Sequence, residues 1–288
     1  MFDLGIRKDI EKLDPHTLGS IKIVGWDITR AGGGELLDIK DVLDQGGKGD
    51  IDAVIWSHWH FDHTGDMTRF PKNVDLVVGP GFKENKIPGY PTNPAAGISE
   101  DAWEGRTLRE LDFAAAGLKI GGYEAVDYFG DGSFYLLSTP GHAIGHMSAL
   151  ARTTASPEES FVFLGGDIVH FNGGFRPTQQ VPLPCSELDD DPRTTPFFKI
   201  ADGPDGQRVA HNHANTQQSV DHMEIFDADD RILIIIAHDA SLLDVIDEMF
   251  PKTLNGWKVK GWKQRGRWAF LPQMENKAGK LNIEVPKV

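Results

Sequence analysis

Residues 57–66 hold a dense set of potential metal ligands in the segment SHWHFDHTGD. This segment places three histidines and two aspartates within ten positions. Burying so many basic and acidic groups together without an ion would cost considerable free energy. Neutral imidazoles and carboxylates suit zinc, and they also suit manganese or iron. The segment therefore predicts a metal site rather than a set of isolated core or surface histidines.

The spacing within this segment limits how it can fold. On a continuing strand, side chains alternate between two faces, so His58, His60 and Asp62 would share one face. His63 would then point away. On a helix, His58 and Asp62 would align but His60 would not. We therefore predict a loop directly after a buried strand, with Gly65 relaxing the turn, which can present ligands toward two neighbouring ions.

Short runs of β-branched and aromatic residues predict the strands that position these ligands. The runs are Asp52–Trp56, Leu76–Val78, Ser133–Leu137, Ser160–Leu164 and Arg231–Ile236. Four of the five runs lead into a ligand-type residue, and these residues are His58, His142, Asp167 and His238. Functional residues of α/β folds gather at the carboxyl ends of strands. We therefore expect these four strand ends to line one edge of a layered sheet.

The remaining chain predicts helices and two long loops. Helical patterns cover Ile39–Gln45, Glu100–Leu111, Thr216–Phe226 and Ser241–Met249. Two stretches rich in proline and glycine, 79–97 and Asn172 to about Asn215, also contain aromatic or apolar anchors. Long loops in compact domains are often lids or binding loops. We therefore predict one α/β domain over residues 1–288, with a lid or substrate loop at 171–215.

Composition excludes several classes of protein. The formal net charge of −14 argues against nucleic acid as the main partner. The basic segment GWKVKGWKQRGRW at 256–268 is interpreted as a solvated amphipathic surface with tryptophan anchors. The longest apolar run, Ile232–Ala237, is far shorter than the roughly 20 residues of a membrane span. The N-terminus predicts no signal peptide.

A single cysteine, Cys185, bears on the compartment. One cysteine cannot form an intrachain disulfide, so we expect a reducing, cytoplasmic environment. Cys185 also has no paired motif beside it, which argues against a nucleophilic role.

Four motifs together resemble those of the metallo-β-lactamase superfamily. In chain order they are SHWHFDHTGD, TPGHAIGHMS, GGDIVH and IIIAHD. The HxHxDH form with TPGH and a late HD is similar to the N-acyl-homoserine lactonase-like branch. The flanking segments look closest to fungal members, and they read GIRKD, AVIWSHWHFDHTGDMTRFP and GRWAFL. The resemblance implies a four-layer αβ/βα sandwich with two zinc ions, manganese or iron being alternatives.

The resemblance also implies a role for each ligand. The first ion would be held by His58, His60 and His142. The second would be held by Asp62, His63 and His238, with Asp167 bridging the two. A hydroxide shared by both ions would then attack a carbonyl carbon. Asp62 would also carry a proton to the leaving group.

Three departures from the family pattern are informative. Met1 directly precedes FDLG, where the family has a strand hairpin, so we expect the first sheet to lack edge strands. An exposed edge favours pairing with another chain, so we expect a homodimer. His170 holds the place of a tyrosine in bacterial lactonases and is a candidate donor to a substrate oxygen, a supporting role being the alternative. His60 stands where the oxygen-reducing di-iron branch has glutamate, which favours hydrolysis.

The leading hypothesis is a dinuclear hydrolase that opens a lactone or a related cyclic ester or lactam. Its partner would be a small-molecule substrate, and we expect no nucleic acid and no membrane as partners. Phe171, Phe175 and Trp59 are candidates for the pocket wall, although Trp59 would equally suit packing below the pocket. A thioesterase of the glyoxalase II or polyketide-linked type is the alternative.

Another class of enzyme is a mononuclear iron sulfur dioxygenase, which would leave the second ligand set unused.

The other polar residues near the motifs have simpler interpretations. We expect Asp66 and Asp239 to cap helices or to hydrogen-bond to the metal ligands, rather than to bind metal themselves. We expect His146 to be structural. The loose set His211, His213 and His222 is expected on the lid rather than at a separate metal site.

Overall fold

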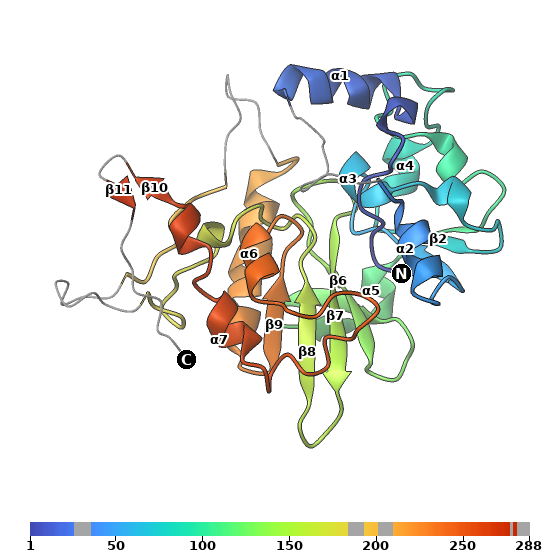
Figure 1. Ribbon diagram of the computed structural model, residues 1–288. Helices are drawn as coiled ribbons and strands as arrows, with labels where there is room; N and C mark the ends of the chain where they lie inside the picture. Colours follow the sequence, from blue (N-terminus) through green and yellow to red (C-terminus); the bar gives the residue numbers. More distant parts are fainter. Residues whose placement is uncertain (26–35, 184–192, 201–209, 277–278, 281–288) are drawn as a thin grey trace. The chain divides into compact units, whose positions relative to one another are not determined.

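The computed structural model describes residues 1–25, 36–183, 193–200, 210–276 and 279–280 (Figure 1). Cys185 and part of the predicted lid at 171–215 lie outside these residues. The chain divides into an N-terminal unit, Met1–Asp112 with Ala143–His146, and a C-terminal unit, Phe113–His142 with Met147–Val288. Every helix in the described part of the chain is too short or too polar to cross a bilayer.

A parallel sheet of three strands organises the N-terminal unit. Its order is β1 (Ala53–Ile55), β2 (Asp75–Val78) and β3 (Leu108–Glu110). The first two strands confirm predicted runs, and Val54, Leu76 and Val78 pack in one buried cluster. The chain start also pairs with β1, because the Asp3 amide donates to the Ile55 carbonyl at 2.9 Å. The edge of β1 that we expected to be open is therefore partly paired.

Short helices surround this sheet. They are η1 (Ile10–Lys12), α1 (Pro15–Val24), α2 (Ile39–Gln45), α3 (Phe61–Thr64), η2 (Met67–Arg69), α4 (Phe82–Lys86) and η3 (Glu100–Ala102). The bounds of α2 match the prediction, and a capping box at Asp38 and Asp41 begins this helix.

The helix predicted over 100–111 is wrong. The chain forms only η3 there and then enters β3. Gly105 adopts a positive φ of 71°, which breaks the helical path. Arg106 follows, and its guanidinium donates to the carbonyls of Val74 at 2.8 Å and Met67 at 2.7 Å. Long-range pairing and this buried arginine override the local helical pattern.

A mixed sheet of six strands organises the C-terminal unit. Its order is β4-β5-β6-β7-β8-β9. The strands are β4 (Leu118–Ile120), β5 (Tyr123–Asp127), β6 (Phe134–Ser138), β7 (Met147–Thr154), β8 (Ser160–Leu164) and β9 (Ile232–Ile235). Neighbours from β4 to β8 are antiparallel, whereas β8 and β9 are parallel. Consequently β6, β8 and β9 run in one direction, and their carboxyl ends share one edge.

The predicted runs on β6, β8 and β9 are confirmed, while β4, β5 and β7 escaped prediction. The strand β7 reads MSALARTT, with small and polar residues instead of a β-branched run. The other elements are α5 (Phe113–Ala116), η4 (Asn172–Gly174), α6 (His213–Ala228), η6 (Ala240–Asp244), α7 (Trp262–Gly266), η7 (Leu271–Gln273), β10 (Glu275–Asn276) and β11 (Gly279–Lys280). Helix α6 contains the predicted helix 216–226. The predicted helix 241–249 is shortened to η6.

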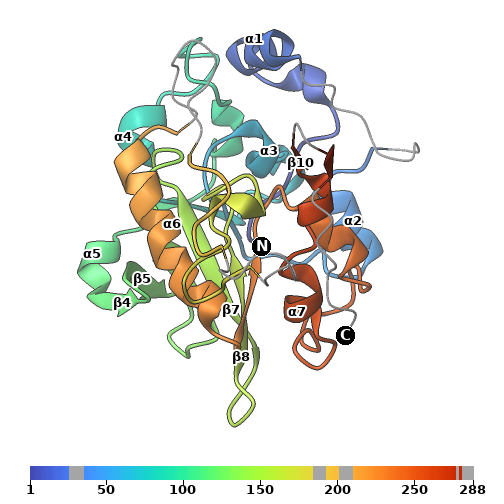
Figure 2. The same ribbon diagram turned by 90° about the vertical axis from the view of Figure 1, so that its left-hand side faces the viewer.

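Both faces of the six-stranded sheet are covered. Ile232 and Ile234 pack in the core beneath α6, whereas Leu233 packs against Trp257 and Trp262. Figure 2 shows α6 and α7 on opposite sides of this sheet. Strands buried on both faces need continuous apolar sequence, which explains the run RILIII. Both tryptophans are fully buried and Val259 between them is 95% exposed, which confirms the predicted tryptophan anchors. Lys263 of the same segment is buried, so the prediction that its charged residues are all solvated is wrong.

A buried ion pair fixes the end of α6. Arg176 donates to the two oxygens of Asp227 at 2.7 and 2.6 Å. The Lys263 ammonium donates to the carbonyls of Asp227, Asp229 and Ile232 at 2.7 Å each. These carbonyls would otherwise be unsatisfied at the helix end. The buried cations therefore complete the hydrogen bonding where α6 turns into β9.

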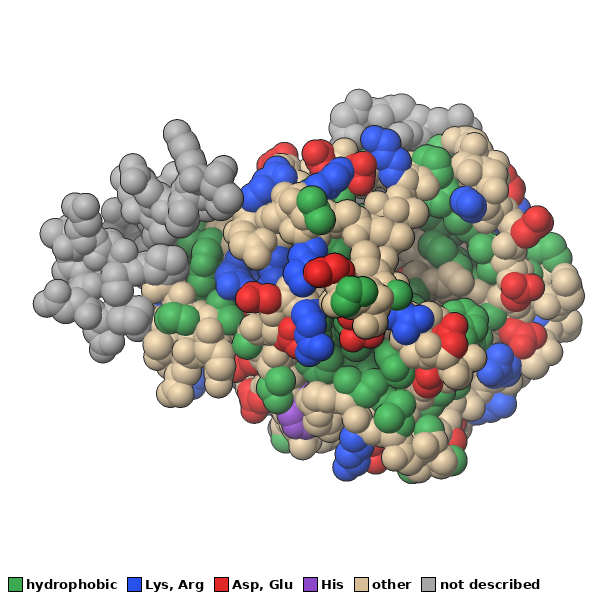
Figure 3. All heavy atoms as spheres, turned by 90° about the horizontal axis from the view of Figure 1, so that it is seen from below, with side chains coloured by type: hydrophobic (Ala, Val, Ile, Leu, Met, Phe, Trp, Pro, Cys, Tyr) green, Lys and Arg blue, Asp and Glu red, His purple; other side chains and the backbone are tan. Residues whose placement is uncertain are grey.

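An apolar cavity of about 340 Å³ lies at the amino ends of β8 and β9. Its walls include Phe161, Phe226 and Ile232, with Arg231 at the rim. Figure 3 shows apolar side chains gathered on one face, with acidic and basic side chains beside them. This cavity lies at the opposite ends of β8 and β9 from Asp167 and His238.

Glu224 makes stability depend on pH. Burial, with the nearby Asp221 and Asp227, raises its pKa from 4.5 to about 7. The folded state therefore holds this proton more tightly than the unfolded state, and stability falls as pH rises through 7. We expect Glu224→Gln to raise stability at pH 8 by roughly 1 kcal/mol, allowing for solvent screening of this half-buried group, and to have little effect at pH 4.

Thermal unfolding at the two pH values measures this effect, with a rise in Tm of roughly 2–4 °C expected at pH 8. The exposed Glu84→Gln is the control. An equal shift at both pH values would show that the carboxylate charge is not responsible.

Candidate metal centre

The predicted loop after β1 carries the first candidate ligands. Residues 56–58 are almost fully buried, and α3 then begins with His60 as its N-cap. Gly65 ends α3 with φ 51°, and an added Cβ there would lie 2.4 Å from the Leu4 Cβ. The prediction of a loop closed by Gly65 is therefore correct, with one helical turn inserted. Glycine is needed both for the backbone angle and for the close approach.

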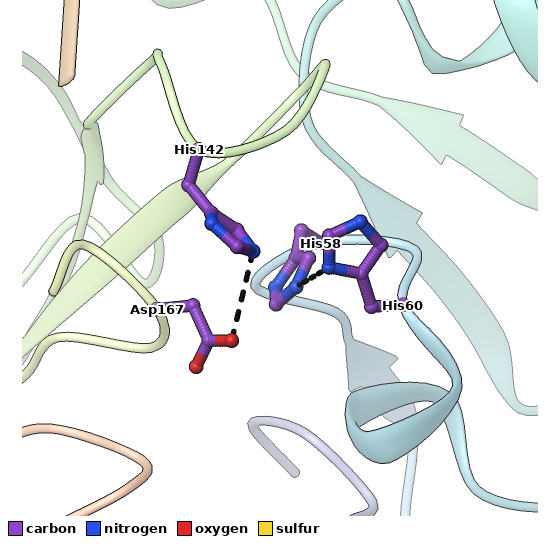
Figure 4. A group of neighbouring side chains, drawn as sticks. All are labelled: His58, His60, His142 and Asp167. Atoms are coloured by element: carbon purple, nitrogen blue, oxygen red, sulfur yellow. Dashed lines mark hydrogen bonds and ion pairs between the residues drawn. The ribbon is translucent and has the colours of Figure 1, made fainter. Parts of the chain in front are cut away.

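Two imidazoles converge in this loop. His58 Nε2 and His60 Nδ1 lie 2.8 Å apart, and Figure 4 shows their rings turned toward each other. His58 is 3% exposed, so water contributes little to its polar contacts. Two basic nitrogens aimed at one point are suited to share a cation, and this donor set fits a divalent metal ion.

Asp3 supports the third histidine. Its Oδ2 lies 2.8 Å from His63 Nδ1, and its Oδ1 accepts from the Ser57 amide at 2.6 Å. This leaves His63 Nε2 to face Asp62, whose Oδ2 lies 3.7 Å away. A carboxylate behind a ligating histidine fixes the ring and its tautomer. Sequence reasoning missed Asp3, although FDLG was part of the family resemblance.

Asp167 gathers three imidazoles in the C-terminal unit. Its Oδ2 lies 3.2 Å from the Nε2 atoms of His238 and His170, and 3.6 Å from that of His142. Figure 4 shows the His142 ring directed at this carboxylate. Asp167 is 2% exposed, so a nearby positive charge is needed to offset its burial. The shared carboxyl edge of β6, β8 and β9 delivers His142, Asp167 and His238, as predicted. The fourth predicted strand end, before His58, belongs to the separate three-stranded sheet, so the prediction of a single sheet edge is wrong for His58.

Close backbone packing shapes the loop that bears His142. Gly141 has φ 136°, and an added Cβ would lie 2.2 Å from the Thr216 amide nitrogen. The His211 amide donates to the His142 carbonyl at 3.0 Å, just before α6. The start of α6 therefore fixes the backbone that presents His142.

Several residues near the candidate ligands cap helices or pack beside these ligands, as predicted. Asp239 caps η6 by accepting from the Ser241 amide, and it also accepts from Asn172 Nδ2 at 2.6 Å. Asp66 caps η2 by accepting from the Thr68 amide at 2.9 Å. His146 is 1% exposed, with its ring centroid 5.3 Å from that of His58.

The predicted substrate residues lie in different environments. Phe175 is fully buried in the core beneath α6. Phe171 is partly buried, with its ring against Phe198 and Phe270. Trp59 is partly buried beside His60, with their ring centroids 4.6 Å apart. A direct role in substrate binding stays a prediction for all three.

The remaining histidine set has no ligand geometry among the described residues. The candidate metal groups found there omit His211, His213 and His222. His222 packs its ring against Tyr123, with centroids 5.2 Å apart. The candidate ligands for divalent ions are instead His58, His60, Asp62, His63, His142, Asp167 and His238.

Comparison with known proteins identifies the family of this chain. The family model of the metallo-beta-lactamase superfamily matches residues 32–233. The chain belongs to this superfamily. Gamma-lactamase FDB1 of Fusarium pseudograminearum is 42% identical, over 94% of this chain and 68% of its own length. Metallo-hydrolase mfmC of Annulohypoxylon moriforme is 42% identical, over 99% of this chain and 79% of its own.

A solved structure supports the same fold. The crystal structure of a quorum-quenching N-acyl homoserine lactone lactonase aligns with a TM-score of 0.52 at 16% identity. It covers 87% of this chain and 78% of its own. The α/β metallo-beta-lactamase fold and the resemblance to fungal members are thus confirmed. The chain is a metal-dependent hydrolase of this superfamily.

Asp3 offers a test of how His63 is held. We expect Asp3→Asn to lower metal affinity by about 10–100-fold, because the ring would lose its carboxylate partner. Competition with a chromophoric chelator measures the affinity. The neighbouring Asp9→Asn, which removes a partner of Arg7 and Lys12, is the control. Equal affinities for Asp3→Asn and the native chain would contradict the assigned support.

Proposed function

We propose that this hydrolase holds two divalent ions, zinc in the first instance, and opens a lactam or lactone ring. One ligand group would be His58, His60, His142 and Asp167, and the other Asp62, His63, Asp167 and His238. The observation that carries the proposal is the ring of imidazoles around the buried Asp167 carboxylate. The paired nitrogens of His58 and His60 support it.

The side chains fit this chemistry. When bound, two ions would lower the pKa of a water toward about 7 and polarise a carbonyl group. Asp62 would take the proton from that water and deliver it to the leaving nitrogen or oxygen. The exposed side chain of His170, 45% accessible, would donate a hydrogen bond to a substrate oxygen. A group that is both exposed and held by Asp167 can reach substrate without losing its orientation.

The chemistry of the site and the names of relatives support the proposed substrate class. A gamma-lactamase and a metallo-hydrolase are 42% identical to this chain, which favours a cyclic amide or ester of small size. The net charge of −14 disfavours a polyanionic substrate. Thioester cleavage uses the same attack on a carbonyl carbon. A thioester is therefore the alternative substrate to compare with a lactam or lactone in the same assay.

Metal content and a substrate panel test the proposal together. We expect two equivalents of metal per chain, loss of activity on chelation, and restoration by zinc, manganese or iron. We expect a five-membered lactam or lactone to be opened faster than an acyl thioester is cleaved. Asp167→Asn should lower metal affinity by more than the ~10–100-fold typical of a group that only supports a ligand.

Two results would overturn parts of this proposal. One iron per chain with oxygen consumption would indicate the dioxygenase class instead. Thioester cleavage without ring opening would retain the metal centre and replace the substrate class.

His170 has its own test. We expect His170→Phe to lower kcat for ring opening by about 10²–10³-fold, because one donor to the developing oxyanion is lost. Metal content should stay at the native value. The exposed His16→Phe controls for adding an aromatic ring elsewhere. Full turnover by His170→Phe would remove this residue from the mechanism.

A further inference from the structure

An unassigned lysine lies against the metal-binding segment. Lys86, the last residue of α4, places its Nζ 3.0 Å from the ring centroid of Trp59. Trp59 separates His58 from His60 in the sequence. Its indole contacts the His60 imidazole edge to face, with an interplanar angle of 74°. Lys86, Trp59 and His60 thus form a continuous row of contacts within the N-terminal unit.

Trp59 depends on packing for its position. Its Nε1 is buried without a hydrogen-bond partner among the described residues. Gly97, at φ 70°, approaches the indole so closely that an added Cβ would lie 3.3 Å from Cζ3. The ring therefore lies between a close backbone and a cation, and no hydrogen bond within the described chain fixes its rotation.

Lys86 contributes charge as well as bulk. Its ammonium also approaches the Ala96 carbonyl at 3.4 Å. Burial lowers the pKa of Lys86 to about 8, so the ammonium form predominates at pH 7. A cation over an indole face is attracted by the ring quadrupole, most strongly when both are shielded from water. A neutral side chain of the same length would keep the packing and lose this attraction.

We propose that Lys86 is a positioning residue for the metal centre. Its ammonium holds the Trp59 indole, and the indole holds the His60 imidazole in the orientation that binds metal. This inference rests on the proposed role of His60 as a ligand. It also assigns Trp59 a position behind the ligand, the alternative to a place in the substrate pocket wall.

Zinc affinity of the full chain tests the inference. We expect Lys86→Met to weaken zinc binding by about 10-fold, the scale of a lost supporting contact, with unchanged Tm. Lys86→Arg should restore affinity, because a guanidinium also lies well over an indole. Lys83→Met on the same helix is the control, since that side chain is exposed. Lys86→Gln replaces Lys86→Met if the latter lowers Tm.

Imidazole NMR of the metal-free protein separates this inference from the proposed function. We expect the His60 ring resonances to shift or broaden in Lys86→Met and to keep their native positions in Lys83→Met. Native His60 resonances and native zinc affinity in Lys86→Met would overturn the positioning role. Equal losses in Lys86→Met and Lys86→Arg would overturn the role of the cation. A native chain that binds no zinc, yet shows the His60 response, would overturn the metal proposal alone.

Discussion

Burial of polar ligand atoms is the constraint on which the candidate centre depends. His58, His63, His142 and Asp167 are each at most 6% exposed. A buried imidazole or carboxylate is stable only when it is hydrogen-bonded or paired with another polar group. Asp3 meets His63, and three imidazoles meet Asp167. The same loss of water makes these groups strong ligands for a cation.

Strand direction explains how distant segments deliver such groups. In the C-terminal unit, β6, β8 and β9 point the same way, so the residues after them gather at one edge. Apolar packing on both faces of that sheet fixes the strand ends, with α6 on one face and Trp257 and Trp262 on the other. The core thereby sets the positions of polar groups that it does not touch.

Glycines allow the ligand loops to lie close to other backbone. Gly141 leaves no room for a Cβ beside Thr216, and Gly97 leaves little beside Trp59. Both adopt positive φ angles, which other residues rarely tolerate. Close-packed loops restrict the positions of the candidate ligand side chains. Supporting contacts, such as that of Asp3 with His63, also restrict the orientation of the ring.

The sequence by itself determined the types and order of the candidate ligands, the family, and the five strands with strong apolar runs. Those features can be predicted locally, because each motif or strand run consists of a few neighbouring residues. Only the tertiary structure decided the rest. It brought Asp3 to His63 and Lys86 to Trp59, buried Phe175 in the core, and replaced a predicted helix at 100–111 with β3. These outcomes depend on contacts between residues far apart in the chain, which local periodicity does not encode.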